Sequence, residues 1–434
     1  MDIENLDGLA EQVQLPQEYD GLPVFVVGGA VRDSIRGVEF HDIDLMVAEV
    51  TPSEMESRGF REIDSANNET FGVFQDSLGR EVALAREEVS TGDGHDDFDV
   101  TPVESSVEAS EALHRDLERR DFTVNAMAFD VRWETLHDPR GGVQDLEDGV
   151  LRAVNADAFK QDPLRILRGA RFAARLDAEI EDTTKGAMWE SVERLPSLPQ
   201  ERVRMEMEKA LVQADEPSRF FRVLEEIAAL DYTFPELHEM KGVPAGPTEY
   251  HDEGDSLTHT MLVLDEMKEL RPDDELALLM ALAHDLGKGV TREEDLPGHP
   301  THAKNGVEVV REMADRLAFS NEQESAMVEA VRFHMRFHDV EDLNDSTIVS
   351  MWKDMDNFHR LWDLALADSK GREPEGEPPS KMAFRRFAAA RKAVDEWTGQ
   401  RLIDEGYSPE EMGGENFGNL LHQKQVERMR ELEE

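Results

Sequence analysis

The sequence predicts a mixed α/β domain at the N-terminus followed by an all-helical remainder. Between Leu22 and Ala153, short apolar runs alternate with turns, as in a sheet covered by helices. From Asp162 onward the apolar residues recur at helical spacing. Two stretches rich in Pro and Gly, at residues 241–247 and 371–379, interrupt the helical part. We therefore divide the chain into segments 1–153, 154–240, 241–370 and 371–434.

The composition excludes several classes of protein. At 434 residues the chain is too long for one compact core. It contains 0 Cys, which excludes disulfides, thiolate zinc sites and thiol nucleophiles. No apolar run reaches the roughly 18 residues that a membrane span needs, and the acidic N-terminus does not resemble a signal peptide. We expect a soluble, cytoplasmic protein with no membrane partner.

The net charge is strongly negative. The chain has 96 acidic and 47 basic residues, so its formal net charge is -49, whereas a nucleic-acid enzyme usually carries a basic footprint. The acids are spread along the whole chain, as in proteins adapted to very high salt, where a Debye length of about 3 Å screens long-range repulsion. Because 39% of the residues are hydrophobic, an acidic disordered protein is excluded. The negative charge therefore predicts a halophilic protein and says little about which partner the protein binds.

A glycine turn follows the first predicted strand. Leu22–Val27 is a short apolar run, and Gly28 and Gly29 come directly after it. Glycines at such a turn allow backbone N–H groups to approach a phosphate. Arg32 follows on the next predicted helix, where its guanidinium could donate to a phosphate in a fork. This arrangement is typical of a nucleotide site.

Two carboxylates lie shortly after this turn. Asp42 and Asp44 are two residues apart, and in a strand such residues point to one face. Paired carboxylates can hold divalent cations side by side for in-line attack on a phosphate. In so acidic a chain the pair alone would more often be a solvated strand end. The strand, the Gly-Gly turn and the helix before it favour a catalytic pair.

Three further parts of segment 1–153 have ordinary structural interpretations. Arg119–Ala126 places guanidinium groups beside polar side chains, although a charged helix end is the commoner reading. Asp138–Leu146 contains a Gly-Gly turn, which is more often structural or a hinge than chemical. Thr91–Phe98 is rich in Gly and Asp and predicts a mobile loop.

A basic helix is predicted to begin after Asp162, with Pro163 in its first turn. Its arginines fall at steps of three and four on one face, at Arg165, Arg168, Arg171 and Arg175. A solvated stripe paired with the many acids is an equal alternative. Asp162 and Arg165 also suit base reading, because a carboxylate accepts from the amino group of cytosine or adenine while a guanidinium donates to ring acceptors. Guanine and uracil would present an oxygen to Asp162.

Histidines form a second cluster. Seven of the 14 lie between His251 and His338, including His259 on an amphipathic helix and the adjacent pair His284-Asp285. The others in this region are His299, His302 and His334. A single His would more often be a core residue, but neutral imidazoles together with an Asp are good ligands for a catalytic divalent metal.

Taken together, these segments resemble the class II CCA-adding enzymes of the tRNA nucleotidyltransferase and poly(A) polymerase family. The form they resemble is the bacterial multifunctional one, which also carries an HD phosphohydrolase domain. The resemblance runs from about Phe25 to about Leu343. Its motifs, in order, are Gly-Gly-Ala-Val-Arg-Asp with Asp-x-Asp, Arg-Arg-Asp, Asp-Pro-x-Gly-Gly, Asp-Pro-Leu-Arg, Gln200-Glu201-Arg202-Val203 and His-Asp-Leu-Gly-Lys-Gly. It implies a polymerase β-like α/β nucleotidyltransferase head followed by all-α neck, body and HD domains.

For the head, the resemblance implies that CCA is added to tRNA from CTP and ATP without a nucleic-acid template. Asp42 and Asp44 would be catalytic and bind two Mg²⁺ ions, while the segment 138–142 would act as a hinge between C and A addition. Gln161 stands where the family usually has Glu, so we expect altered selectivity or rate. The implied nucleotide-binding residues are Gly28, Gly29, Arg32, Arg120, Asp162, Arg165, Arg168 and Arg171.

For the HD domain, the resemblance implies phosphatase and 2′,3′-cyclic phosphodiesterase activity with a divalent metal such as Mg²⁺ or Ni²⁺. Asp368 is a further candidate for the last aspartate of the HD motif. The implied metal ligands are His259, His284, Asp285, His302 and His334.

Two other functions compete with this one. A poly(A) polymerase-type RNA-tailing enzyme shares the head, but it lacks an HD domain, so the His-Asp cluster weighs against it. An HD phosphohydrolase whose head only binds RNA has no need for the paired carboxylates Asp42 and Asp44. The sequence leaves the oligomeric state open.

Overall fold

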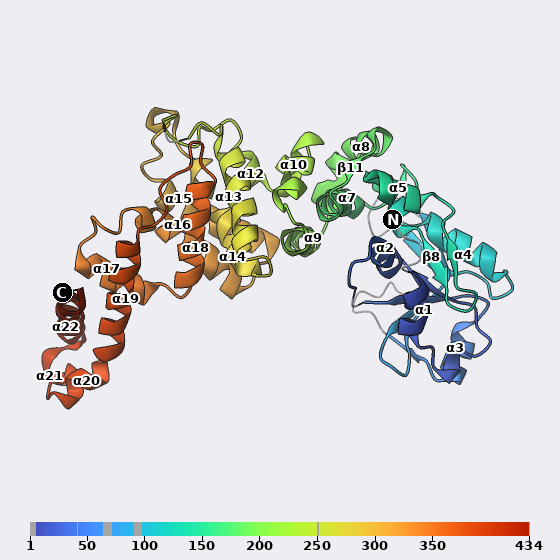
Figure 1. Cartoon of the computed structure of the whole chain (residues 1–434), viewed down its shortest axis with the longest axis horizontal. Coiled ribbons are helices and arrows are strands. Elements are labelled where there is room, and N and C mark those ends of the chain that lie inside the picture. Colours follow the sequence, from blue (N-terminus) through green and yellow to red (C-terminus); the bar gives the residue numbers. More distant parts are fainter. Residues whose placement is uncertain (1–5, 41, 64–71, 91–97, 250, 434) are drawn as a thin grey trace. The chain divides into compact units, whose positions relative to one another are not determined.

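The computed structural model describes residues 6–40, 42–63, 72–90, 98–249 and 251–433 (Figure 1). The chain forms two compact units, which we describe separately. The first comprises residues 1–210 and 219–233, and the second comprises residues 211–218 and 234–434. The loop predicted at Thr91–Phe98 lies outside the described residues except for Phe98, which begins a strand.

A seven-stranded mixed sheet forms the head of the first unit, in the order β3-β4-β5-β2-β1-β8-β9. Strand β1 pairs antiparallel with both β2 and β8, and β2 pairs parallel with β5. A separate hairpin joins β6 (Arg86–Ser90) to β7 (Phe98–Pro102). The seven strands are β1 (Val24–Val27), β2 (Asp44–Val47), β3 (Arg61–Glu62), β4 (Val73–Gln75), β5 (Glu81–Leu84), β8 (Ala128–Asp130) and β9 (Thr135–His137).

The central strands are apolar on both faces because helices cover them. All four residues of β1 are buried, as expected for a strand inside a covered sheet. One face packs on α4 (Ala109–Glu118), where Phe25, Val27 and Met46 share a core with Leu113. The head also contains α1 (Asp7–Val13), α2 (Gly29–Arg36), α3 (Pro52–Arg58), the 3₁₀ turn η3 (Thr123–Asn125) and α5 (Gly142–Asp148).

Helices make up most of the rest of the first unit. The basic helix predicted after Asp162 is α7 (Leu164–Leu176), and Pro163 is its N-cap. Strands β10 (Val150–Leu151) and β11 (Glu179–Ile180) pair in parallel beside it. The other helices are α6 (Ala158–Gln161), α8 (Asp182–Trp189), α10 (Ser218–Glu226) and α11 (Leu230–Thr233), and α9 (Gln200–Gln213) runs from the first unit into the second.

The second unit is helical throughout its described part, apart from one isolated bridge between Pro244 and Asp255. Helix α13 packs on α14 and α18, and α16 packs on α14, α15 and α18. The principal helices are α13 (Ser256–Leu270), α14 (Glu275–Ala283), α15 (His302–Leu317), α16 (Asn321–His338), α17 (Asp345–Asp354), α18 (Phe358–Lys370), α19 (Lys381–Glu396) and α22 (Gly414–Glu433). The shorter ones are α12 (Pro235–His238), α20 (Gly399–Asp404) and α21 (Pro409–Met412). The predicted order of a mixed α/β head and an all-helical remainder is confirmed.

No helix among the described residues is long and apolar enough to cross a membrane.

The predicted hinge segment begins a helix. Asp138 accepts hydrogen bonds from the N–H groups of Gly142 (2.7 Å) and Val143 (3.0 Å), which caps α5. Gly142 packs directly against the 3₁₀ turn η3, because a Cβ on it would lie 2.3 Å from the carbonyl oxygen of Thr123. A side chain at this position would push α5 away from η3.

We therefore expect Gly142→Ala to destabilise the first unit by about 1–3 kcal/mol, the usual cost of overpacking a close contact. The measurement is the change in free energy of unfolding in urea. The matched control is Gly186→Ala in α8, where a Cβ would meet nothing within 4 Å and a helical Ala should be neutral or stabilising. Equal stability of the two variants would contradict the close contact.

Candidate functional site

A carboxylate and a guanidinium lie beside Gly28, at the end of the central strand β1. Val27 pairs with Asp44 in the antiparallel register of β1 and β2, so the turn after β1 lies beside Asp44. Gly28 has φ 73° and ψ -126°, a conformation that residues with a Cβ avoid. A Cβ here would lie 2.9 Å from Arg120 Nη1 and 3.8 Å from Asp44 Oδ2. The absent side chain leaves room for both groups.

The two predicted catalytic carboxylates differ in position. Strand β2 begins at Asp44, so the expectation that both lie within the strand is wrong for Asp42, which precedes it. Desolvation raises the pKa of Asp44, Arg120 lowers it, and the neighbouring charge of Asp42 raises it. The two carboxylates are therefore close enough to repel each other. Such a pair of hard oxygen donors fits Mg²⁺, which would relieve the repulsion.

Arg32 is part of a buried network and not of the open surface. Its side chain is 2% exposed, and its Nε and Nη2 donate to the two carboxylate oxygens of Asp33 at 2.9 and 2.8 Å. Its Nη1 donates to Asn125 Oδ1 at 2.6 Å, which joins helix α2 to the turn η3. The expected contact of Arg32 with a triphosphate stays a prediction, because the guanidinium is held by these two side chains here.

Asp121 continues this network to helix α7. Its carboxylate accepts from Asn125 Nδ2 (3.0 Å), from the N–H of Phe122 (2.8 Å) and from Arg168 Nε (2.7 Å). Burial alone would raise the pKa of Asp121, but Arg168, Asn125 and the nearby Arg165 hold it far below its usual range. Asp121 is therefore charged at neutral pH and fastens α7 to the Arg-Arg-Asp segment.

Three arginines of the α7 stripe, Arg168, Arg171 and Arg175, form ion pairs, and Arg171 is buried. Arg171 is 5% exposed and its Nε lies 2.6 Å from Glu206 Oε2. Arg175 Nη2 lies 2.9 Å from Asp33 Oδ2. The interpretation of a solvated stripe is therefore wrong for Arg171, although the acidic partners that it invoked are present. Arg168 and Arg171 also lie over the ring of Phe172, at 5.5 and 4.1 Å from its centroid.

The two predicted base-reading residues lie at the start of α7. Asp162 Oδ1 accepts from the N–H of Leu164 at 3.0 Å, so one carboxylate oxygen caps the helix. Arg165 Nη2 donates to the carbonyl oxygen of Arg119 at 2.8 Å. Both side chains are half-buried. The same Arg-Arg-Asp segment that holds Arg120 near Asp44 therefore also positions Arg165.

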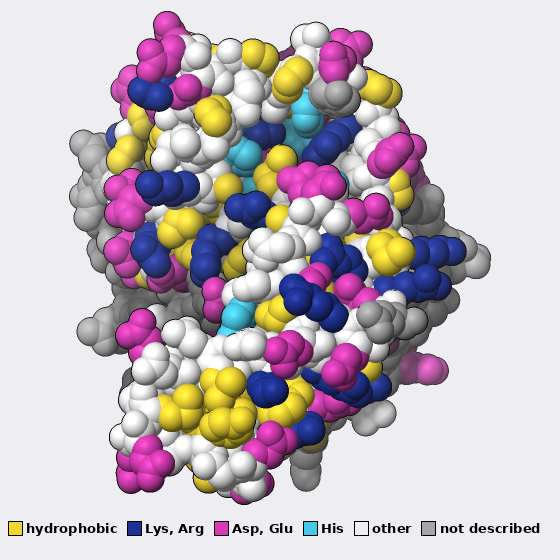
Figure 2. Space-filling view, turned by 90° about the vertical axis from the view of Figure 1, so that its left-hand side faces the viewer, with side chains coloured by type: hydrophobic (Ala, Val, Ile, Leu, Met, Phe, Trp, Pro, Cys, Tyr) yellow, Lys and Arg dark blue, Asp and Glu magenta, His cyan; other side chains and the backbone are white. Residues whose placement is uncertain are grey.

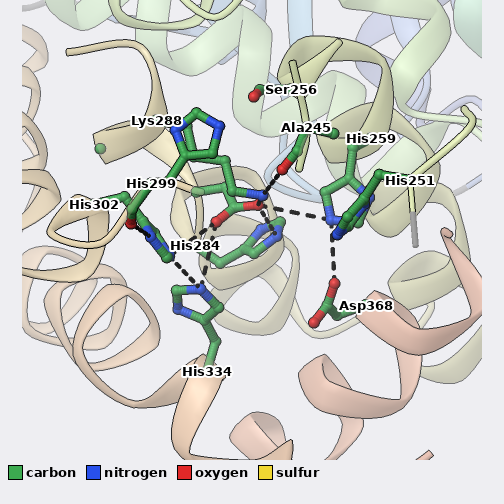
Figure 3. A network of polar contacts seen from close by, with 12 residues as sticks. Ala245, His251, Ser256, His259, His284, Lys288, His299, His302, His334 and Asp368 are labelled. Atoms are coloured by element: carbon green, nitrogen blue, oxygen red, sulfur yellow. Dashed lines mark hydrogen bonds and ion pairs between the residues drawn. The ribbon is translucent and has the colours of Figure 1, made fainter. Parts of the chain in front are cut away.

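The second unit brings the predicted His-Asp cluster together at one centre (Figure 3). Two fully buried groups of three potential ligands adjoin, each with its ligand atoms within 4.8 Å of one another, and a third, partly buried group of His251, Glu253 and His259 shares His259. His302 Nε2 and His334 Nε2 lie 3.2 Å apart, and both approach Asp285 Oδ1, at 3.5 and 3.4 Å. The members of the two fully buried groups are His259, His284 and Asp368, and Asp285, His302 and His334. All six are buried, and the cluster includes every predicted ligand together with Asp368.

Backbone carbonyls fix the tautomers of three of these histidines. The Nδ1 atoms of His284, His302 and His334 lie 2.7, 2.7 and 3.1 Å from the carbonyl oxygens of Ala281, His299 and Ala330. A carbonyl oxygen only accepts, so Nδ1 carries the proton and Nε2 keeps its lone pair. A hydrogen bond from Nδ1 to a carbonyl oxygen orients the imidazole so that Nε2 can bind a metal. Burial lowers the pKa of His302, so its ring stays neutral at neutral pH.

Unsatisfied buried atoms show that the centre fits a metal ion. Both ring nitrogens of His259, the Nε2 of His284 and the Oδ1 of Asp285 are buried and make no well-aligned hydrogen bond, although oxygens of Glu253, Asp368 and Asp285 lie 3.0, 3.1 and 3.2 Å from the three nitrogens. Buried polar atoms are rarely left this way, because each costs about 1–3 kcal/mol. Asp285 and Asp368 remain ionised, since neighbouring Lys288 and His259 outweigh burial and hold both pKa values well below the usual range. A divalent cation would satisfy these donors.

The centre opens into a pocket of about 210 Å³ whose lining includes Lys288, His299 and Arg372. In the space-filling view, His side chains lie in a hollow flanked by Lys and Arg (Figure 2). Lys288 Nζ lies 2.7 Å from Asp285 Oδ2, and Arg372 Nη2 lies 2.6 Å from Asp368 Oδ2. The pocket therefore combines potential metal ligands with cations, which suits an anionic substrate.

One carboxylate beside this centre, Glu253, was not predicted from the sequence. Glu253 Oε1 lies 2.6 Å from His251 Nδ1 and 3.0 Å from His259 Nδ1. Burial would raise the pKa of Glu253, but contacts with both histidines and the N–H of Glu373 lower it to about 2. The spacing of His251 and Glu253, just before helix α13, was the available signal. Glu253 is placed to orient His259 toward the centre.

Comparison with protein families matches three segments of the chain. Residues 24–152 match the "Poly A polymerase head domain", and residues 256–371 match the "HD domain". Residues 177–241 match a family described as "Probable RNA and SrmB- binding site of polymerase A".

Curated relatives match most of the chain. A Multifunctional CCA protein of Stenotrophomonas maltophilia (strain R551-3) is 38% identical over 83% of this chain and 91% of its own length. One of Shewanella denitrificans is 38% identical over 89% of this chain and 93% of its own. The chain belongs to the CCA-adding enzyme family, in the multifunctional form with an HD domain.

Solved structures of CCA-adding enzymes share the fold. One apo form has a TM-score of 0.64 at 22% identity and covers 99% of this chain and 95% of its own. The Thermotoga maritima CCA-adding enzyme complexed with tRNA has a TM-score of 0.60 at 19% identity, covering 99% and 93%. The predicted polymerase-type head followed by helical domains is confirmed.

In this member of the CCA-adding enzyme family, we expect Asp121→Asn to destabilise the first unit. Removing one partner of a buried ion pair costs about 3–5 kcal/mol, and we expect the lower end because the Arg168 side chain is 34% exposed. The control is Asp157→Asn, an exposed carboxylate in a loose pair with Lys160, which should change stability by less than about 0.5 kcal/mol.

The pH dependence gives an independent check on the same variant. Because the folded-state pKa of Asp121 is depressed, its contribution to stability is present above the unfolded-state pKa and is lost as the pH falls. Urea unfolding at several pH values should show a weaker acid dependence in Asp121→Asn than in the unmodified protein. An identical pH dependence would contradict a charged, buried Asp121.

Proposed function

We propose that the head adds C, C and A to the 3′ end of tRNA from CTP and ATP without a template. The arrangement of Gly28, Asp44 and Arg120 at one strand end carries this proposal. It is supported by curated relatives named Multifunctional CCA protein and by similar structures described with CTP, ATP and tRNA. Our domain assignment is a head at 1–153, a neck and body at 154–240, an HD domain at 241–370 and a tail at 371–434.

In this proposal Asp42 and Asp44 would hold two Mg²⁺ ions. Bound there, the ions would supply activation of the tRNA 3′-hydroxyl and charge stabilisation at the α-phosphate. The backbone at Gly28 and Gly29 would cradle the triphosphate with Arg120 beside it, the N–H of Gly28 being shared with the carbonyl oxygen of Met127 at 3.4 Å. Arg120 is held ready for this role, because Asp116 accepts from its Nε and Nη2 at 3.3 and 3.1 Å.

Selection of C and A is assigned to the start of α7. The free carboxylate oxygen of Asp162 would accept from the amino group of the base, while Arg165 would donate to the ring acceptors. The ion pairs of Arg168 with Asp121 and of Arg171 with Glu206 would hold α7 in position. Gln161, in place of the usual acid, leaves Asp162 as the charged acceptor at this point, from which we expect altered selectivity or rate.

For the second unit we propose a metal-dependent phosphohydrolase that acts on phosphomonoesters and 2′,3′-cyclic phosphates. His259, His284, Asp285, His302, His334 and Asp368 would hold one or two divalent ions, such as Mg²⁺ or Ni²⁺. The bound metal would supply an activated water. Lys288 and Arg372 would contribute positive charge to the pocket, and they would keep the neighbouring carboxylates of Asp285 and Asp368 ionised.

Two variants separate the two activities. Asp44→Ala should abolish nucleotide incorporation into tRNA that lacks its CCA end while leaving hydrolysis of bis(p-nitrophenyl) phosphate unchanged. His284→Ala should do the reverse, because it removes a ligand of the second centre only. Incorporation is measured with CTP and ATP separately and together, at low and high KCl.

Ordered addition of C, C and A supports the proposal, whereas an untemplated A tail would favour RNA tailing of the poly(A) polymerase type. Hydrolysis without any incorporation would favour a phosphohydrolase with an RNA-binding head. Loss of both activities in either variant, with circular dichroism unchanged, would contradict two separate centres.

A further inference from the structure

A second hollow of the second unit is basic. It has a volume of about 630 Å³ and lies between α15, α16 and α17. Its charged lining residues are Lys304, Arg311, Arg332 and Arg336, and its floor includes Phe333. We call this hollow the basic groove. No described Asp or Glu lines it, although acids outnumber bases in the chain by 96 to 47.

The cations of the basic groove are only weakly neutralised. Arg311 and Arg332 each lie near one acid, Glu324 at 3.8 Å and Asp354 at 3.6 Å, in long and exposed pairs. Exposed pairs of this kind contribute about 0–1 kcal/mol each. Neither of the other two cations, Lys304 and Arg336, forms an ion pair with any residue in the described part of the chain. Their charge is available to an anion from solution.

The basic groove shares its two helices with the candidate metal centre. Lys304 follows His302 by two residues on α15, and Arg336 follows His334 by two residues on α16. Two residues along a helix turn the side chain by roughly 200°, to nearly the opposite side. The inner sides of α15 and α16 therefore supply potential metal ligands, while their outer sides supply the cations.

A polyanion fits the basic groove better than a single phosphate does. The cations are distributed along two helices and do not converge on one point, which matches the repeated phosphates of a nucleic-acid strand. The rest of so acidic a surface repels RNA, so cations that act at contact range decide where a strand is held. Guanidinium groups retain such contacts at high salt because they donate to phosphate in a fork.

We propose that the basic groove binds the ribose-phosphate backbone of tRNA, on the side of α15 and α16 that faces away from the candidate metal ligands. This inference rests on tRNA being the substrate, as proposed above, and adds a docking surface for it. A phosphorylated or acidic protein partner is the competing occupant, and it would leave RNA binding unchanged when the groove is altered.

The test is binding of fluorescein-labelled tRNA lacking its CCA end to the full chain, followed by anisotropy over a range of KCl concentrations. The double variant Lys304→Glu, Arg336→Glu should bind at least tenfold more weakly. The slope of log K against log[KCl] should also fall in magnitude by about 1–2, since each phosphate contact accounts for roughly 0.7–0.9. The matched control is Arg292→Glu, Lys392→Glu, two exposed sites outside the groove with the same change in charge.

A second readout separates docking from chemistry. Hydrolysis of bis(p-nitrophenyl) phosphate should be unchanged in the groove variant, while KM for tRNA ending in a 2′,3′-cyclic phosphate should rise. If charge reversal unfolds the protein, as judged by circular dichroism, the Gln variants at both positions replace it, with a smaller loss expected.

Unchanged tRNA affinity and salt slope in the groove variant would overturn the proposal, and so would an equal loss in the control variant. Binding is measured without nucleotides, so it does not depend on CCA addition. A protein that binds tRNA through the groove but adds no CCA would contradict only the proposed head activity.

Discussion

The first unit depends on the burial of one carboxylate, that of Asp121. It is 7% exposed and lies at the junction of three segments that are far apart in the sequence. Through Asn125 it is linked to Arg32 after the glycine turn, and through Arg168 to helix α7. A buried charge is tolerated only when it is paired and hydrogen-bonded, so these partners cannot move independently. The network therefore makes the glycine turn, the Arg-Arg-Asp segment and the arginine helix one structural element.

This arrangement gives the arginines of the head different roles. Arg32, Arg168 and Arg171 are engaged with buried acids, and Arg120 is held by the buried Asp116 but also lies next to Gly28 and the candidate catalytic carboxylate. In a chain of net charge -49, these guanidinium groups are therefore neutralised locally by acids within the fold. The second unit uses a similar principle, because carbonyl oxygens fix the histidine tautomers and leave the lone pairs facing one another.

The fold order was predicted from the sequence, and short local motifs pointed to the residues that the structure brings together beside Gly28 and in the His-Asp cluster. A glycine turn after an apolar run, an Asp-Pro helix start and a His-Asp pair can each be recognised within a few residues. The pairing of Asp121 with Arg168 spans 47 residues, so only the folded chain shows that an arginine of the apparent basic stripe is an anchor. Glu253 was missed for a different reason, because one more Glu in so acidic a chain carries little signal even though its partner His259 is only six residues away.

The most direct test of this account is a double-mutant cycle on Asp121 and Arg168, read out both as free energy of unfolding and as the ratio of CTP to UTP incorporation. Coupled residues of one buried network should show an interaction energy of about 0.5–3 kcal/mol. We predict an interaction energy of this size in the free energy of unfolding. The ratio of CTP to UTP incorporation in the double variant should be no lower than in the single variant with the lower ratio. Strictly additive effects on both quantities would contradict the claim that this ion pair joins the fold of the head to its choice of nucleotide.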